Sequence, residues 1–419
     1  LQYPWARLGD RTARRVPFIV FGTILSASLF LLIAASASPW QLILVVMFQA
    51  IAISMVAPNW SALLGERTAF GKRGRVFGGI SVIGGVSSLS GTLLAAFILF
   101  NQPQTEAHPF QVPFVIAAIV GVLSALVLLF VKEGRRPADG GGVEAADPKT
   151  ERTRRADFLY FTKVQAFYNF FMSMAWPLIP ITTAIVLGAS NLHIVMITVV
   201  SALSTIVAQS QVGRLVDRVG PVSLIKASRF LFVLVPLAYG FANNLLWIYL
   251  VTAVMGVPAA IVNISFNAHI MDVAPPRKHA EYFGIFNGGI GLASFAGSLL
   301  GGYAARGLQA VWPGNLWLAL LVVYLVSMTG RAAGAFLTLK IHDPTSYPES
   351  ADEVWRRFQH YFANGHSRGP PRSFVPFARS GTRVGHAAAP APVPSAASGP
   401  SVSEPSRAQE QSRDKPHSP

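Results

Sequence analysis

The feature that most constrains this chain is a series of long apolar blocks separated by short polar or basic loops. A helix needs about 20 mainly apolar residues to cross the hydrocarbon core of a bilayer. Backbone polar groups in lipid must be satisfied within the segment, and the alternating pattern of a membrane barrel is not what these blocks show, so they predict helices. Ten such segments are expected, at 16–37, 40–63, 75–100, 111–131, 158–187, 191–212, 222–242, 245–270, 281–304 and 315–339.

The composition supports a membrane protein and excludes several other classes. Of 419 residues, 52% are hydrophobic and only 13% are charged, against roughly 25% charged in soluble domains. Cysteine is absent and the nine His are scattered, so we expect no disulfide, no metal site and no cofactor. The net charge of +15 comes from basic residues between apolar blocks. Nucleic-acid binders cluster such residues on a soluble face, and we expect no nucleic acid partner.

The basic residues also predict how the chain is oriented. Lys and Arg are concentrated in loops 1–15, 64–75 and 132–157, whereas the alternate loops are nearly free of them. Basic loops stay on the cytoplasmic side of a membrane. We therefore expect a multi-pass protein of the plasma or inner membrane, with both visible ends of the chain in the cytoplasm.

Composition shifts along the chain predict four regions. Residues 132–157 are rich in Gly, Pro and charge, which predicts a cytoplasmic linker. The linker would separate an N-terminal half with four helices, residues 1–131, from a C-terminal half with six helices, residues 158–340. Residues 341–419 are polar and then rich in Pro, Ala and Ser, which predicts a mostly disordered cytoplasmic tail.

The two halves share a tandem repeat. RLGDR at 7–11 matches RLVDR at 214–218, and FGGISVIGGVSSLSGTLL from Phe77 aligns with FGIFNGGIGLASFAGSLL from Phe283. The offset of about 206 residues also brings Glu66 onto Asp272. Because the offset spans six helices, both copies keep the same orientation, as in parallel repeats. Six helices per repeat predict twelve, so we expect two helices to belong before the first residue given.

These residues carry a resemblance to a known family. The chain resembles the major facilitator superfamily (MFS), in which the loop between the second and third helices of each half reads roughly G-x-L-x-D-R-x-G-R-R. Here the two copies are ARLGDRTARR and GRLVDRVGPV. Ala6 and Ala13 replace glycines in the first copy, and Pro221 and Val222 replace the basic pair in the second. The resemblance implies an all-α MFS fold and a secondary transporter that works by alternating access.

The repeated loops predict a cytoplasmic gate. Asp10 can accept hydrogen bonds from the N-terminus of a helix in the opposite half, where the helix dipole favours an anion, and Asp217 would do the same reciprocally. We expect the arginines of each copy to pair with Glu66 or Asp272. The alternative is that these residues only set topology, which needs the arginines but not a matched Asp. The expected gate residues are Asp10, Arg11, Arg14, Arg15, Glu66, Arg214, Asp217, Arg218 and Asp272.

Polar residues inside the apolar segments predict a substrate pathway, because such residues are costly in lipid and usually functional. The resemblance implies that the first and fourth helices of each half line the central cavity. Amide and aromatic groups would suit a neutral or weakly polar ligand, although each could instead bond neighbouring helices. The expected pathway residues are Gln49, Gln165, Tyr168, Asn169, Trp176, Asn263, Asn267 and Asn287.

These features favour one function over three alternatives. We expect a monomeric transporter of a small solute, with the cargo, the direction and any coupling ion left open. A transporter-like receptor or scaffold that signals through the long tail is one alternative, and an inactive truncated product is another. An enzyme is disfavoured, because no predicted helix carries paired acids, a Ser–His pair at helical spacing or a metal cluster.

Overall fold

A computed structural model describes residues 2–12, 14–66, 68, 72–99, 108–131, 148–275 and 278–341. The side chains of 66, 108–110 and 148–150 lie outside this description. So do most of the expected linker, at 132–147, and all but the first residue of the expected tail, at 342–419.

The described residues fold into helices, ten stretches of which are long and apolar enough to cross a membrane. The ten predicted segments are therefore confirmed as helices. In chain order the elements are α1 (Gln2–Thr12), α2 (Val16–Ala34), α3 (Pro39–Glu66), α4 (Arg73–Leu99), α5 (His108–Leu128), α6 (Pro148–Ala175), α7 (Leu178–Ile181), the π-helix η1 (Thr182–Val186), α8 (Asn191–Val219), α9 (Pro221–Gly240), α10 (Leu245–Val273), α11 (His279–Val311) and α12 (Leu316–Leu339).

Two helices extend into regions that were predicted to be loops. Residues 1–15 were predicted as a loop, but most of them form α1, in which Ala6 and Gly9 are buried while Arg7 and Arg11 are exposed. The predicted linker is shortened by α6, which begins at Pro148 instead of near 158. Proline is favoured in the first turn of a helix because its missing N–H has no partner there.

The predicted helix 158–187 is interrupted. The chain turns at Trp176 and Pro177 and then continues as the short helix α7 and the π-helix η1. Pro177 and Pro180 have no backbone N–H to donate to the preceding turn, which ends regular α-helix locally. Apolar length alone predicts an unbroken helix here, because it takes no account of these two prolines.

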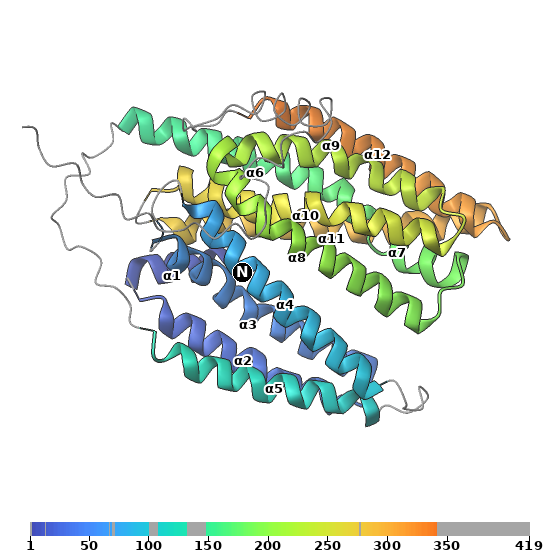
Figure 1. Ribbon diagram of the computed structural model, residues 1–419, viewed down its shortest axis with the longest axis horizontal. Coiled ribbons are helices and arrows are strands. Elements are labelled where there is room, and N and C mark those ends of the chain that lie inside the picture. The colour runs from blue at the N-terminus through green and yellow to red at the C-terminus, as the bar shows by residue number, and fades with distance from the viewer. Residues whose placement is uncertain are drawn as a thin grey trace, which may run out of the picture. The chain divides into compact units, whose positions relative to one another are not determined.

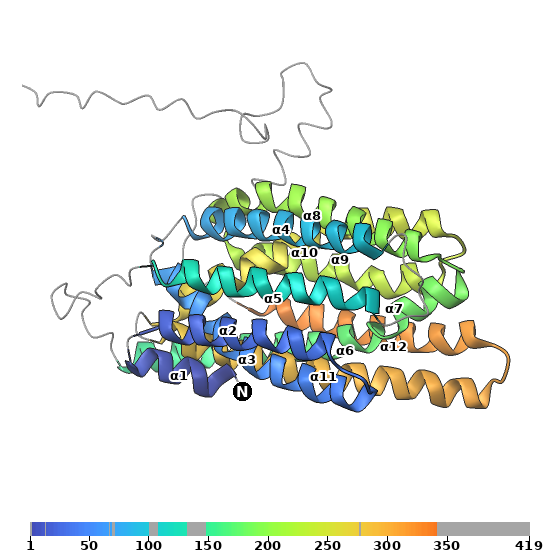
Figure 2. The ribbon, with the colours of Figure 1, turned by 90° about the horizontal axis from the view of Figure 1, so that it is seen from below.

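The packing of the helices repeats in the two halves of the chain. We call α1–α5 the first half and α6–α12 the second half. In the first half α2 packs against α3 and α5, and in the second half α9 packs against α10 and α12. The halves meet where α4 packs against α8 and where α1 packs against α11 (Figures 1 and 2). These two contacts are equivalent, because the repeat matches α1 with α8 and α4 with α11.

The RLxDR segments of α1 and α8, which take part in these two contacts, lie near the same helix ends. Figure 1 shows the α1–α2 and α8–α9 connections at the left. We call this side the basic-loop end, because the two RLxDR segments lie there. They form the last turns of α1 and α8 and keep the name RLxDR loops below. The α8–α9 connection is the single residue Gly220, whose φ of +92° favours glycine, and Pro221 starts the next helix.

Candidate functional site

Asp10 connects the two halves from the first RLxDR loop. Its Oδ2 accepts a hydrogen bond from the backbone N–H of Glu281 at 2.8 Å, and its Oδ1 accepts one from Arg15 Nη2 at 2.7 Å. Glu281 lies in the first turn of α11, which begins at His279. The N–H groups there lack partners within the helix, and the dipole makes that end favourable for a carboxylate. Arg15 is 1% exposed, so Asp10 serves both a helix end and a buried cation.

Asp217 makes the equivalent contact from the second RLxDR loop. Its Oδ1 accepts from the backbone N–H of Gly74 at 2.7 Å and its Oδ2 from that of Arg75 at 3.1 Å. Both donors lie in the first turn of α4, which begins at Arg73. Each RLxDR loop therefore places its Asp at the N-terminus of a helix in the opposite half.

Glycines let the helices approach closely enough for these bonds. A Cβ atom on Gly213 would lie 2.6 Å from the carbonyl oxygen of Gly74, and one on Gly78 would lie 3.1 Å from the Cα of Gly213. At the matched contact, a Cβ on Gly284 would lie 3.0 Å from the Cβ of Ala6. Small residues permit such backbone contact between membrane helices.

Asp272 pairs differently from the prediction. We expected Arg214 or Arg218 as its partner, but Asp272 forms an ion pair with Arg73, at the start of α4 in the opposite half. Arg214 Nη2 instead donates to Gln211 Oε1 at 3.1 Å. Arg73 had been assigned only to membrane orientation, because counting basic residues in a loop cannot reveal which of them crosses to the other half.

Three expected gate arginines, Arg11, Arg14 and Arg218, form no ion pair within the described chain. Arg11 and Arg14 are exposed, and Arg218 is half-buried. Arg15 pairs with Asp10, and its expected pairing with Glu66 stays a prediction. The side chain of Glu66 lies outside the described residues.

Three of the expected pathway residues lie inside the second half. Gln165 and Tyr168 are 0% exposed and Asn169 is 5% exposed. Gln165 Oε1 accepts from Arg229 Nε at 2.9 Å, and the Tyr168 hydroxyl donates to the backbone oxygen of Arg229 at 2.8 Å. Asn169 Nδ2 donates to the backbone oxygen of Gln165 at 2.8 Å, within the same helix. The neighbouring helix α9 thus provides the partner of Gln165 and Tyr168, and α6 itself provides that of Asn169.

The other expected pathway residues are more accessible. Asn263 is exposed, Trp176 is 48% exposed, and Gln49, Asn267 and Asn287 are half-buried. Asn267 Nδ2 donates to the backbone oxygen of Asn263 at 2.6 Å. The eight residues therefore form two groups, one packed between helices and one with part of its surface uncovered.

Two buried arginines were missing from the predicted site. Arg229 on α9 is 1% exposed, and its guanidinium lies 4.2 Å from the ring centre of Tyr168 and 5.0 Å from that of Phe266. Arg331 on α12 is 1% exposed and donates to the backbone oxygens of Phe232 and Met172, both at 3.0 Å. A charged residue inside an apolar segment is the sequence signal that marks both arginines. The sequence alone does not determine whether the Arg331 side chain points into the helix bundle or toward the cytoplasm.

The described residues contain no group of three or more His, Cys, Asp or Glu that could hold a metal ion. His269 is 2% exposed, and its ring centre lies 4.4 Å from that of Phe161, with the two ring planes tilted. It therefore packs against an aromatic residue of the core of the second half.

Comparison with known proteins agrees with this architecture. The family model described as Major Facilitator Superfamily matches residues 1–172 and again residues 161–378. An uncharacterized MFS-type transporter of Methanocaldococcus jannaschii is 35% identical over 119 residues, which are 28% of this chain. The match covers 31% of the length of that relative.

Solved structures with the same fold are transporters. The human organic anion transporter MFSD10 superposes with a TM-score of 0.61 at 17% identity, over 80% of each chain. The MFS transporter FucP in its outward conformation superposes with a TM-score of 0.57 at 14% identity, over 80% of this chain and 86% of that one. At these identities the two structures show a shared fold, and it is the family match that places the chain among multi-pass membrane transporters rather than enzymes. The chain belongs to the major facilitator superfamily.

Proposed function

We propose that this protein carries a small solute across the membrane by alternating access, with Asp10 and Asp217 at the centre of a cytoplasmic gate. One observation carries the proposal: each RLxDR loop places its Asp on the N-terminus of a helix in the opposite half. Topology alone needs basic residues in these loops. It does not need two carboxylates bonded to helix ends across the boundary between the halves.

The strength of these contacts suits a gate that opens and closes. A carboxylate at a helix N-terminus contributes about 0.3–1 kcal/mol, and up to about 2 kcal/mol when partly buried. Two such contacts and the Arg73–Asp272 ion pair can hold the halves together at the basic-loop end and still be broken when a solute binds. A set of this kind has two arrangements and follows the rocking of the halves.

The close contacts are concentrated toward the basic-loop end of the paired helices. On α4, Cβ atoms added to Gly74, Gly78 or Gly85 would meet α8, whereas one added to Gly91, farther along the helix, would meet nothing within 4 Å. On α11, Gly284 contacts α1, whereas Gly302 again has nothing within 4 Å. This distribution supports a form in which the basic-loop end is closed.

The solute pathway is proposed to use the accessible polar residues. Asn263, Asn267 and Asn287 on α10 and α11 combine exposed or half-buried amides that can hydrogen-bond a neutral or weakly polar solute. Gln49 adds a half-buried amide, and Trp176 adds an exposed indole ring. The protein is proposed to act as a monomer in the plasma or inner membrane, with both ends in the cytoplasm, and a coupling ion is compatible with this scheme.

Reconstitution tests this function directly. Liposomes that contain the full-length protein should accumulate or release at least one solute of a broad panel faster than protein-free liposomes. Replacing Asn263 or Asn287 by Ala should then slow that solute, whereas Asn243→Ala, at an exposed site between α9 and α10, should not. Uptake equal to that of protein-free liposomes over the whole panel would contradict the proposal.

A further inference from the structure

A pocket of about 360 Å³ lies between α4 of the first half and α8 of the second, near the basic-loop end. The α4 residues that line it are Arg75, Gly78, Gly79 and Val82, and the α8 residues are Gln209, Ser210, Gly213 and Arg214. Its walls thus come from both halves, and the pocket exists in this shape only while α4 and α8 are in contact.

Glycines create the hollow. Gly78 and Gly213 are in contact, since a Cβ on Gly78 would lie 3.1 Å from the Cα of Gly213. Beside this contact, a Cβ on Gly79 would meet nothing within 4 Å. The two helices therefore touch on one side of the pocket and leave space on the other.

Two guanidinium groups border this space, and most of their N–H donors are available to a ligand. The side chain of Arg75 is 63% exposed, and its Nε lies 3.9 Å from Asp217 Oδ2, beyond hydrogen-bonding distance. Within the described part of the chain Arg214 pairs with no carboxylate and donates to Gln211. An arginine has five N–H donors in a planar fork that matches a phosphate, so most of these donors are available to a ligand.

Gln209 adds a buried polar group with an unfilled bond. It lines the pocket, is only 6% exposed, and its Oε1 has no hydrogen-bond partner within the described chain. The oxygen and nitrogen of a side-chain amide exchange places by a flip. The same side chain can therefore present an N–H to an anion.

Apolar side chains continue the pocket along both helices. Val82 and Val86 follow Arg75 by seven and eleven residues, and Val207 and Leu203 precede Arg214 by the same spacings, which keep each set on one helix face. Val86, Leu203 and Val207 are 49%, 49% and 66% exposed. At about 1.5 Å per residue they extend roughly 10–16 Å from the arginines. Two cations therefore lie at one end of an apolar track.

We propose that this pocket binds the headgroup of an anionic phospholipid from the leaflet at the basic-loop end, and that the bound lipid holds α4 against α8. Basic pockets between membrane helices recognise such headgroups, and the apolar track suits the acyl chains. Because both halves supply the walls, the lipid binds the joined arrangement better than the separated one and shifts the equilibrium toward it.

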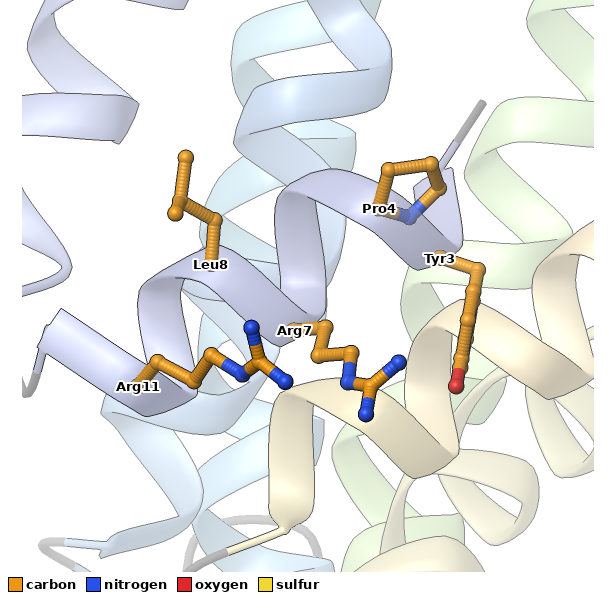
Figure 3. Close-up of a pocket in the computed structure, with 5 residues that line it drawn as sticks. All are labelled: Tyr3, Pro4, Arg7, Leu8 and Arg11. Atoms are coloured by element: carbon orange, nitrogen blue, oxygen red, sulfur yellow. The ribbon is translucent and has the colours of Figure 1, made fainter.

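The repeat supplies an internal comparison for the charge of this pocket. A second hollow of about 260 Å³ lies on α1, where Arg7 and Arg11 line it and extend in the same direction along the helix (Figure 3). The repeat matches Arg7 with Arg214, but it matches Arg75 with Glu281, whose carboxylate lies 3.5 Å from the hydroxyl of Tyr3. The position matched with Arg75 thus carries an acid, which contacts Tyr3 at the α1 hollow, and we expect weaker binding of an anionic lipid there.

Native mass spectrometry of the purified full-length protein tests the lipid site. Phosphatidylglycerol should bind more tightly than phosphatidylcholine. Arg75→Gln and Arg214→Gln should each weaken that binding about fivefold, since an arginine at an anionic surface contributes about that factor. Arg75→Lys, which keeps the charge but not the fork, should lose less. Arg7→Gln is the matched control and should change the binding little.

Three results would overturn the assignment. Unchanged phosphatidylglycerol binding in the Arg75→Gln, Arg214→Gln double variant would show that the pocket is not the site. An equal loss in Arg7→Gln would show that charge anywhere on this side suffices. Complete competition by millimolar sodium phosphate would identify a site for the free ion instead of a lipid.

A second measurement follows the conformational effect. Met271 is 1% exposed and its thioether lies against Gly65 of the other half, so a Met271→Cys thiol should react with a maleimide only when the halves separate. Phosphatidylglycerol nanodiscs should slow this reaction relative to phosphatidylcholine nanodiscs, but not in the double variant. If Asp217→Asn accelerates labelling while phosphatidylglycerol has no effect on it, the proposed gate is supported and the proposed role of the lipid is contradicted.

Discussion

Asp10 and Glu281 are separated by 271 positions in the chain, yet the Asp10 carboxylate accepts the backbone N–H of Glu281 at 2.8 Å. The matched carboxylate, Asp217, accepts the backbone N–H of Gly74 at 2.7 Å. The two bonds are related by the internal repeat and connect the same two halves in opposite directions. A change in one should therefore resemble a change in the other.

The first prediction concerns the charge of these two residues. Asp10→Asn and Asp217→Asn keep an oxygen acceptor but lose the negative charge that the helix N-terminus favours, at a cost of about 1 kcal/mol each. Asp10→Asn also removes the charge that pairs with buried Arg15. Either variant should raise the maleimide reactivity of Met271→Cys about fivefold and lower transport. The absence of native cysteine keeps the background labelling low.

Membrane expression is the control for these variants, and it should stay at the wild-type level because no part of the helix cores changes. Equal labelling rates in the wild type and in both Asn variants would remove the gate role from Asp10 and Asp217. A change in only one of them would contradict the reciprocal arrangement.

Much of the architecture could be predicted because bilayer spans leave a direct mark on sequence. Apolar length gave the ten helices, and the repeated RLxDR loops gave the register between the halves. The position of helix ends was less predictable. α1 lies in a charged stretch whose buried face consists of Ala6 and Gly9, and such small residues add little to an apolar count.

The second prediction concerns the close contact between Gly74 and Gly213. A Cβ on Gly213 would lie 2.6 Å from the oxygen of Gly74, so Gly213→Ala should push α8 away from α4. Overpacking of this kind costs about 1–3 kcal/mol, here mainly in the joined state. The labelling rate of Met271→Cys should rise.

Gly84→Ala is the matched control, since α4 leaves a Cβ at that position without a neighbour within 4 Å. It should leave labelling unchanged, and its better helix propensity should not lower thermal stability. Gly301→Ala gives a contrast inside the second half, where the added Cβ would collide with the oxygen of Met174. That variant should lower the melting temperature. Identical behaviour of all three would show that the Gly213 contact has no special part in closure.

The third prediction concerns the ion pair between Arg73 and Asp272. Their side chains are 16% and 4% exposed, and removing one partner of a buried pair costs up to about 3 kcal/mol because the other charge remains. Arg73→Asp should therefore open the basic-loop end, and adding Asp272→Arg should restore closure. Maleimide labelling of Phe77→Cys measures this opening and closure, because Phe77 is 5% exposed and packs in the core of the second half.

Neutral replacement of both residues is the control for this pair. The Arg73→Gln, Asp272→Asn variant should label between the wild type and Arg73→Asp. If the swapped variant labels as fast as Arg73→Asp alone, the two residues do not act through their mutual attraction.

The candidate site was less predictable than the fold. Sequence identified Asp10 and Asp217, because a matched Asp in two copies has no topological purpose. It could not identify Arg73 as the partner of Asp272, since loop 64–75 contains several basic residues of equal standing. It also could not separate Gln165 and Tyr168 from Asn263, because all are polar residues within apolar segments and differ only in what packs against them.

The fourth prediction tests whether Gln165 belongs to the core or to the pathway. Gln165 Oε1 accepts from Arg229 Nε at 2.9 Å. Gln165→Leu leaves that buried donor without its acceptor, which costs about 1–3 kcal/mol and should lower the melting temperature by several degrees. Arg229→Met together with Gln165→Leu removes both partners and should recover part of the loss.

Asn263→Leu, at an exposed position on α10, is the control. It should change the melting temperature little and should strongly reduce transport. If Gln165→Leu instead abolished transport at an unchanged melting temperature, Gln165 would contact the solute, and the bond to Arg229 would be a feature of the closed form that opens during transport.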